Sequence, residues 1–203
     1  MFPAKLDLPL TGLDWLEYYA AYNAYHPALD INSGSGNQDL GNDVVSPATG
    51  FVEFVYTGWN HVGFGKFIVI QHSDGNFTRY AHLLDVEVQQ GKEVRKGDLI
   101  GHVGNSGTTY AHLHFEVFGE KMAEIQKKHW RPWRYYPVGK TKAWVVEHYV
   151  NPWEWIKSTE IDEWRVNAEK WASNYIKDMP AFMKSFDAHK WIELIRRSII
   201  DNK

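Results

Sequence analysis

The sequence predicts a mainly β protein, a compact antiparallel sheet or sandwich, followed by a C-terminal α-helical extension. Two observations support this prediction. Short runs rich in Val, Ile, Phe and Tyr recur between about Asp30 and Val117 and are separated by Gly, Asn and Asp. From Thr159 onward, apolar residues instead recur every three or four positions. Closely spaced short strands are typical of antiparallel sheets, whereas the second spacing is that of one helix face.

The predicted strands are short and are divided by turn sequences such as SDGN at 73–76 and GNSG at 104–107. In chain order they cover 44–45, 50–56, 66–72, 77–83, 99–103 and 112–117. Two stretches, VVSPATGFVEFV and GKEVRKGDLIGHVG, look like related hairpin elements. Before the strands, residues 12–25 are expected to form either a short helix or a wrapped aromatic arm.

Three further segments fall outside this β pattern. The stretch KKHWRPWRYYPVGK is basic and aromatic, so residues 121–148 are predicted to be an insertion loop. Its Trp and Arg side chains either contact sugars and peptide carboxylates or pack against the protein. The sequence VNPWEWI is predicted to be a closing strand or turn, and residues 157–203 a helical hairpin docked on the β domain. The expected domains are therefore 1–156, with a motif core at 25–117, and 157–203.

Composition excludes several classes of protein. Hydrophobic residues make up 44% and charged residues 23% of the 203 positions, which is ordinary for a globular protein. The formal net charge of -3 gives no indication of a general nucleic-acid binder, and no apolar run is long enough for a membrane span. The sequence contains no cysteine, which excludes disulfides and thiolate metal ligands. The first residues do not have the pattern of a signal peptide.

Four of the ten histidines form a constellation with two carboxylates nearby. HPALD places His26 four residues before Asp30, and YAHL places His82 at the end of a predicted strand. In AHLHFEV, His112 and His114 are two residues apart and therefore share one face of a strand. Catalytic zinc sites use three protein ligands and leave one position open, and His26, Asp30 and one histidine of the HLH pair would supply three. The other six histidines are expected to have surface or packing roles.

The motifs HPALD, YAHL and HLHFE together resemble those of the lysostaphin-type (LytM-type) zinc endopeptidases of bacterial peptidoglycan. The resemblance covers about Tyr25 to Val117, and VNPW is similar to the closing segment of the family. Two departures stand out: Ala28 occupies a position where the family usually has Gly, and Tyr110-Ala111 replaces a usual Gly-Pro. The resemblance implies a duplicated, hybrid-like β fold.

The resemblance also implies site residues and a reaction. His26, Asp30 and His114 would bind one zinc ion per chain, and His82 and His112 would be the catalytic histidines. Glu116 lies on the face of His114 and would hold a histidine ring N–H or make a surface pair. The implied substrates are stem or bridge peptides of peptidoglycan. Action on the cell wall is then expected in the periplasm or outside the cell, from a phage-type lysin or a trimmed secreted protein.

Two other functions remain open on the sequence. One is a catalytically inactive relative that binds and activates another cell-wall hydrolase, although all five key positions are present here. The other is a carrier domain of the biotinyl or sugar-phosphotransfer type, whose hairpins can look like VSPATGFV and VRKGDLIG. A carrier needs an exposed Lys in a tight turn between its halves, and no Met-Lys pair lies between these two hairpin stretches. It would also leave the histidine motifs unexplained.

Overall fold

The computed structural model describes residues 16–19, 24–32, 36–58 and 63–159. The chain divides into two compact units, Met1–Trp155 and Ile156–Lys203. A helix covers 152–159, and the rest of the predicted helical hairpin, with its expected docking, lies outside the described residues. Within the described part of the chain, no helix combines the length and apolar character that a membrane crossing requires.

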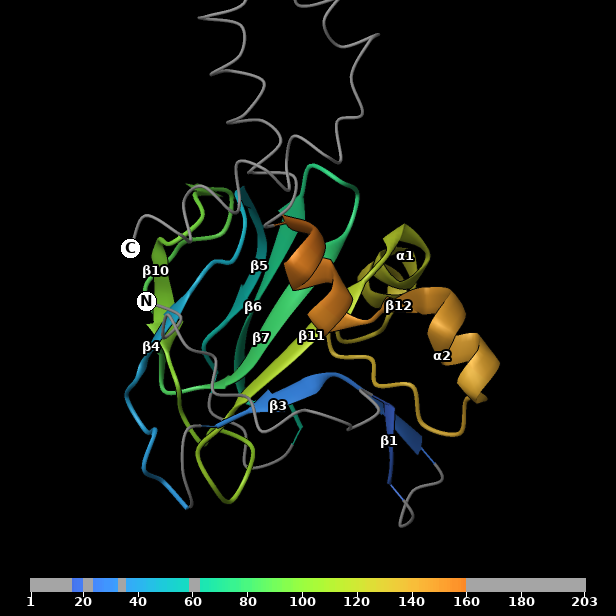
Figure 1. Ribbon diagram of the computed structural model, residues 1–203, viewed down its shortest axis with the longest axis horizontal. Coiled ribbons are helices and arrows are strands. Elements are labelled where there is room, and N and C mark those ends of the chain that lie inside the picture. The colour runs from blue at the N-terminus through green and yellow to red at the C-terminus, as the bar shows by residue number, and fades with distance from the viewer. Residues whose placement is uncertain (1–15, 20–23, 33–35, 59–62, 160–203) are drawn as a thin grey trace, which may run out of the picture. The chain divides into compact units, whose positions relative to one another are not determined.

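A seven-stranded antiparallel sheet forms the centre of the first unit (Figure 1). Its four long strands lie side by side in the order β11-β7-β6-β5. Their bounds are β5 (Gly50–Tyr56), β6 (Lys66–His72), β7 (Phe77–Leu83) and β11 (Leu113–Phe118). The first three have the bounds predicted from the sequence, and β11 begins one residue later than predicted. The antiparallel β architecture is therefore confirmed.

Short strands complete both edges of this sheet. At one edge, β9 (Glu93–Val94) pairs with β5. At the other edge, β3 (Leu29–Ile31) pairs with the first half of β11, and β12 (Tyr149–Val150) pairs with its end. The closing strand or turn predicted at VNPWEWI is found only at Val150, the last residue of β12, and the rest of that prediction is wrong because a helix covers 152–159. Because β3 lies directly against β11, residues near position 30 come next to residues near position 114.

A second, three-stranded sheet has the order β4-β10-β8, with strands β4 (Asp43–Val45), β10 (Leu99–His102) and β8 (Asp85–Val86). Its outer two strands both pair with β10, so His102 stands between Asp43 and Asp85. The predicted strands at 44–45 and 99–103 are confirmed to within one residue. The two-residue strands β8 and β9 were not predicted, because so short a run has no detectable periodicity.

The N-terminal segment differs from one of the two expectations. Strands β1 (Leu16–Tyr19) and β2 (Ala24–Pro27) form an antiparallel pair, so the helix predicted within 12–25 is wrong for the described residues. Aromatic residues favour extended strands, which explains why the sequence LEYY is not helical.

The core lies on both faces of β6. The four residues from Phe67 to Ile70 are fully buried, which explains why this strand reads as a continuous apolar run instead of alternating. One face of the sheet packs into an aromatic cluster that includes Phe77, Phe118 and Trp133.

Residues 121–148 are not simply a loop. They contain α1 (Glu120–Lys128) and α2 (Lys142–His148), and only the basic aromatic stretch between these helices is irregular. α1 buries Met122, Ala123 and Gln126 on one face, and the Thr141 side chain caps α2 by accepting from the Trp144 N–H. The missed signal is the three- and four-residue spacing of the buried face of α1.

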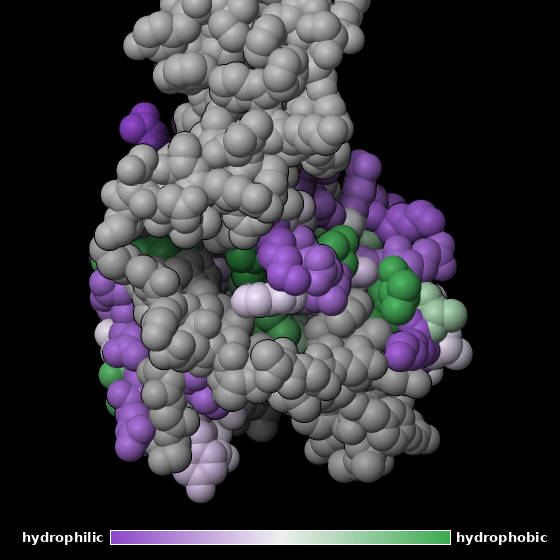
Figure 2. Space-filling view, viewed as in Figure 1, coloured by the Kyte–Doolittle hydropathy of each residue, from purple (hydrophilic) through white to green (hydrophobic). Residues whose placement is uncertain are grey.

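The two tryptophans of the stretch between α1 and α2 have different roles. Trp133 is buried and packs, whereas Trp130 is 75% exposed. Figure 2 shows hydrophilic surface over much of the face that carries α2, with small apolar patches among it.

Candidate metal centre

Three of the predicted site residues meet where β3 joins β11. Asp30 is paired directly with His114 in the register of the two strands, and His26 lies at the end of β2. His26 Nε2 lies 3.0 Å from His114 Nδ1 and 3.2 Å from Asp30 Oδ1. His114 Nδ1 lies 3.0 Å from the same carboxylate oxygen. Both imidazoles are buried, whereas the Asp30 side chain is 35% exposed, so the cluster opens to solvent on the Asp30 side.

This triangle of atoms fits a metal ion. Zinc binds histidine nitrogen and carboxylate oxygen at about 2.0–2.1 Å in a tetrahedron, which sets neighbouring ligand atoms about 3.3 Å apart. The three separations found here are close to that value, and all three atoms can offer a lone pair. One further group of possible ligands, Asp85, Glu87 and His102, occurs among the described residues, in the second sheet.

The charges of the cluster also favour a cation. Burial raises the pKa of Asp30, but hydrogen bonds from His114 and His26 outweigh it and hold that pKa well below its usual range. Burial lowers the pKa of His114, but hydrogen bonds to Asp30 and Glu116 raise it to about 9. Without a metal ion, the cluster therefore retains a proton at neutral pH, since its anionic surroundings stabilise positive charge.

Glu116 lies behind this cluster and is fully buried, so the alternative of a surface pair is wrong. Its Oε1 accepts a hydrogen bond from His114 Nε2 at 2.9 Å, and its Oε2 accepts from Arg79 Nη1 at 2.7 Å. Burial raises the pKa of Glu116, but the charge of Arg79 lowers it below its usual value, so the carboxylate is ionised.

Arg79 was not singled out in the sequence. A signal for it exists in the two motifs themselves. When YAHL and HLHFE are aligned as antiparallel neighbours, Arg79 stands opposite Glu116, as it does in the structure. A charged residue in an otherwise apolar strand, facing a residue of opposite charge, indicates a buried ion pair.

The two predicted catalytic histidines line the same opening. Their ring centroids are 4.7 Å apart, and the His82 ring lies 5.6 Å from that of His114. His112 Nε2 lies 3.8 Å from Asp30 Oδ1. The structure thus brings all five predicted site residues together, around the exposed carboxylate of Asp30.

His82 reaches this position through an irregularity of β7. Ala81 and His82 stand opposite the single residue Phe67, which makes a β-bulge, and His82 has a φ of 62°. That backbone conformation is uncommon for a residue with a side chain and concentrates at functional sites. The bulge turns the imidazole toward Ser106, whose carbonyl oxygen accepts from Nδ1 at 2.9 Å.

Backbone carbonyls set the tautomers of both histidines. The carbonyl of Ser106 accepts from His82 Nδ1, and the carbonyl of Tyr110 accepts from His112 Nδ1 at 3.0 Å. Because a carbonyl oxygen only accepts, each Nδ1 carries a proton and each neutral ring keeps its lone pair on Nε2. Burial, followed by the nearby charge of His114, lowers the pKa of His82 to about 4, which keeps that ring neutral.

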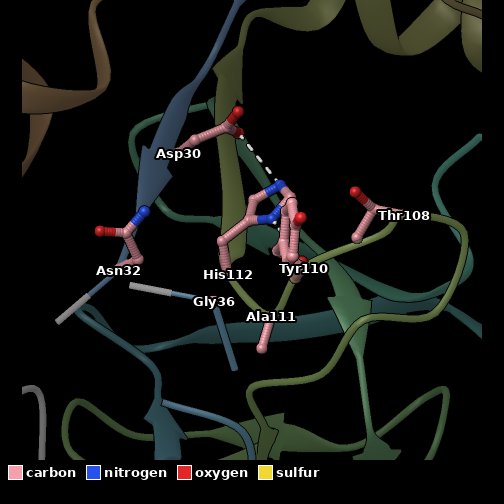
Figure 3. A pocket seen from close by; sticks show the side chains of 7 residues that line it. All are labelled: Asp30, Asn32, Gly36, Thr108, Tyr110, Ala111 and His112. Atoms are coloured by element: carbon pink, nitrogen blue, oxygen red, sulfur yellow. Dashed lines mark hydrogen bonds and ion pairs between the residues drawn. The ribbon is translucent and has the colours of Figure 1, made fainter. Parts of the chain in front are cut away.

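A cavity of about 330 Å³ adjoins the cluster on its exposed side (Figure 3). Its lining comes from the loop before β11 and from residues around β3, namely Asp30, Asn32, Gly36, Thr108, Tyr110, Ala111 and His112. Asn37 accepts a hydrogen bond from the Ala111 N–H through its Oδ1 at 2.8 Å. The Tyr110-Ala111 departure therefore lies in one wall of this cavity.

These features define a mainly antiparallel β protein with a group of histidine and aspartate side chains that can hold a metal ion. The chain belongs to the Peptidase family M23, which residues 24–127 match. The resemblance identified in the sequence is thereby confirmed.

Curated relatives include both activators and peptidases. The chain is 31% identical over 135 residues to the Murein hydrolase activator NlpD of Salmonella dublin, covering 64% of this chain and 32% of that protein. It is 44% identical over 59 residues to the Peptidoglycan DD-endopeptidase ShyA of Vibrio cholerae, covering 29% of this chain and 14% of that protein. The chain thus spans about a third of the length of the NlpD proteins that it matches.

Similar solved structures include LytU, at 29% identity and a TM-score of 0.44, over 51% of this chain and 68% of that one. Lysostaphin from Staphylococcus simulans matches at 23% identity and a TM-score of 0.48, over 73% of this chain and 49% of that one.

Proposed function

We propose that this protein is a zinc-dependent endopeptidase that hydrolyses peptide cross-links of bacterial peptidoglycan. In this proposal His26, Asp30 and His114 bind one zinc ion, and His82 and His112 are the catalytic residues. The observation that carries it is the triangle of three ligand atoms, 3.0–3.2 Å apart, with two further imidazoles at its open side. Such a site has three protein ligands and a free position, as catalytic zinc sites do.

Zinc, when bound, polarises a scissile carbonyl and lowers the pKa of a water molecule to about 7. The chain supplies proton transfer. Because Nδ1 of His82 and of His112 is held by a backbone carbonyl, Nε2 of each ring is free to accept a proton from the attacking water. The same nitrogen then returns a proton to the leaving amine, which completes hydrolysis of the amide.

The substrate class rests on the family and on the shape of the site. The relative ShyA is named a peptidoglycan DD-endopeptidase, and NlpD a murein hydrolase activator, so both names refer to the bacterial cell wall. The cavity beside Asp30 is open, as binding of a polymer-linked peptide requires. We accordingly propose stem or bridge peptides as substrates and the periplasm or cell exterior as the place of action.

The domain arrangement is part of this proposal. Residues 1–156 would form the catalytic domain, with the insertion at 121–148, and residues 157–203 a helical extension. The division of the chain into compact units after Trp155 supports a boundary near position 156.

A second function is favoured by one observation, the name of the NlpD relatives. In this alternative the chain is catalytically inactive and activates another cell-wall hydrolase. An activator has no need of two imidazoles with free Nε2 atoms beside a possible metal site, and this argues for the enzyme.

Incubation with purified peptidoglycan separates the two functions. The wild-type protein with one equivalent of zinc is expected to release peptides with new amino termini, detected by mass spectrometry, and a chelator should abolish the release. If peptides appear only when a second murein hydrolase is added, the activator is correct and the endopeptidase is wrong.

A further inference from the structure

Arg79 is a charged residue in the interior of the main sheet, where apolar side chains are usual. Its side chain is fully buried in β7, between β6 and β11, and its guanidinium lies 4.2 Å from the centre of the Phe64 ring. Burial of a charge is costly unless the charge is paired and hydrogen-bonded. Two groups meet this need: Glu116 Oε2 accepts from Nη1 at 2.7 Å, and the carbonyl of Trp133 accepts from Nη2 at 3.1 Å.

The Trp133 carbonyl comes from the insertion between α1 and α2 and is held firmly in place. The Trp133 N–H donates to the carbonyl of Gln126 at 3.0 Å, and Trp133 has a φ of 63°, which is uncommon for a residue with a side chain. The buried Gln126 side chain also bonds both backbone groups of Tyr135, at 2.9 and 3.0 Å. The insertion thus presents one fixed carbonyl to one buried guanidinium.

The direction of every hydrogen bond from Arg79 to the cluster is determined by chemistry. A guanidinium only donates, and an ionised carboxylate only accepts. Glu116 therefore has one oxygen committed to Arg79, and its other oxygen requires a donor, which is His114 Nε2–H. With its proton on Nε2, a neutral His114 has its lone pair on Nδ1, the atom that faces His26 and Asp30.

We propose that Arg79 and Glu116, anchored by the Trp133 carbonyl, form a positioning relay that fixes the tautomer of His114 for metal binding. Neither residue touches the ion or the substrate. The proposal deepens the proposed function, since it rests on zinc binding at His26, Asp30 and His114. It also gives the insertion at 121–148, which lies outside the metal-site motifs, a role: its Trp133 carbonyl holds Arg79 in place.

The substitution Glu116→Gln tests the direction of these bonds. An amide has one accepting and one donating end, and Arg79 accepts nothing. The amide oxygen therefore turns to Arg79 and the NH₂ group turns to His114 Nε2, which favours the tautomer with its proton on Nδ1. We expect the zinc Kd, measured by competition with a chromophoric chelator, to weaken about 10- to 100-fold.

A second substitution should reverse this loss. In Arg79→Met with Glu116→Gln the guanidinium is absent, so the amide oxygen is free to turn back to His114 Nε2 and accept its proton. The double variant is expected to recover most of the zinc affinity that Glu116→Gln loses. The matched control is Glu147→Gln, which removes an exposed carboxylate paired with Lys121 and should leave zinc affinity unchanged.

The wild-type protein provides a measurement that does not depend on the folding of any variant. Long-range ¹H–¹⁵N spectra of the zinc-loaded protein should show the His114 proton on Nε2. A proton on Nδ1, unchanged zinc affinity in Glu116→Gln, or a double variant that binds zinc no better than Glu116→Gln would each overturn the relay. These readouts do not involve peptidoglycan. A protein that shows the expected zinc affinities yet cleaves nothing would overturn the proposed enzyme and leave the relay standing.

Discussion

Three of the four imidazoles around Asp30, those of His82, His112 and His114, have one nitrogen engaged by a neighbouring acceptor, and that bond determines what the other nitrogen can do. His82 and His112 donate from Nδ1 to backbone carbonyls, which leaves the lone pair of each neutral ring on Nε2, the atom that would transfer protons in the proposed function. His114 donates from Nε2 to Glu116 and turns Nδ1 to His26 Nε2 and Asp30 Oδ1. The two histidines of the HLH motif therefore donate from opposite ring nitrogens, His112 from Nδ1 and His114 from Nε2.

Alanine substitutions should separate these two roles. His82→Ala and His112→Ala are expected to keep near-full zinc but to lose about 100- to 10,000-fold in peptidoglycan cleavage, the usual effect of removing a proton-transfer group. His114→Ala should lose zinc itself. Elemental analysis and a peptide-release assay on each purified variant provide the comparison.

Loss of zinc in His112→Ala would mean that the roles of the two HLH histidines are reversed or that the metal site is closed. Full cleavage activity in both His82→Ala and His112→Ala would contradict acid–base catalysis by these residues.

The sequence motifs predicted which residues would meet, because each motif lies on or beside a strand and the strands pair in register. His114 stands opposite Asp30 for that reason. What the motifs did not reveal is the surroundings of Glu116. The burial of Glu116 depends on the insertion that covers β11 and β7. The role of Arg79 becomes apparent only when β7 is placed beside β11, because this pairing sets Arg79 opposite Glu116.

At the scale of elements, the loop that holds Ser106 must press closely against the end of β7. Gly104 makes this possible, since a Cβ there would fall onto backbone atoms of residues 82–84. Gly119 offers a matched comparison, because no other atom lies within 4 Å of the position of its Cβ.

Gly104→Ala is therefore expected to lower the free energy of unfolding by about 1–3 kcal/mol, the usual effect of overpacking, and to reduce cleavage by displacing His82. Gly119→Ala should cost less than about 1 kcal/mol, as expected at a helix N-cap, and leave cleavage intact. Urea unfolding curves and peptide release measure both effects. Equal stability losses in the two variants would argue against close packing at Gly104.

The second sheet contains a pH-sensitive contact away from the metal centre. His102 in β10 donates to Asp85 Oδ1 of β8 at 2.6 Å, and its Nε2 lies 3.6 Å from Asp43 Oδ1 of β4. The hydrogen bond to Asp85, with the charges of Asp85, Asp43 and Glu87, raises the pKa of His102 above its usual value of 6.5. When it is protonated, the imidazole of His102 joins both outer strands to the central one.

Because the pKa of His102 is raised in the folded state, this contact stabilises the folded protein fully below about pH 6.5. The stabilisation is lost as pH rises through the folded-state pKa. Asp85→Asn should therefore lower the melting temperature clearly near about pH 6 and very little near about pH 9. The exposed Glu93 provides a control, since Glu93→Gln should follow the wild-type pH dependence. A melting-temperature difference for Asp85→Asn that grew with pH would contradict this account.

The long strands of the main sheet were predictable to within a residue because apolar runs and turn sequences define them. The short strands were not, since β8 and β9 exist only through their partners. The helices of the insertion were hidden by their flanking Pro, Arg and Trp residues, although the spacing of Met122 and Gln126 in α1 was a usable signal.

At the scale of the whole molecule, a bound ion adds to folding stability, since it binds the folded chain alone. At a free zinc concentration of 100 times Kd the gain is about 2.7 kcal/mol. Addition of a chelator should accordingly lower the melting temperature of the zinc-loaded protein by several degrees, as followed by calorimetry. His114→Ala is the control and should show no response to the chelator. A wild-type melting temperature that did not change when the chelator was added would contradict metal binding at this site.

The pairing of β3 with β11 places His26 beside His114, 88 positions later in the chain. An ion bound to both residues would join these distant positions in the folded chain. A disulfide stabilises by limiting the unfolded chain, whereas the ion would stabilise by binding the folded chain. This chain contains no cysteine. A zinc ion at the proposed site would therefore give the chain a long-range cross-link that does not depend on the oxidising or reducing character of its surroundings. Scarcity of zinc would then lower the folding stability and the proposed activity together.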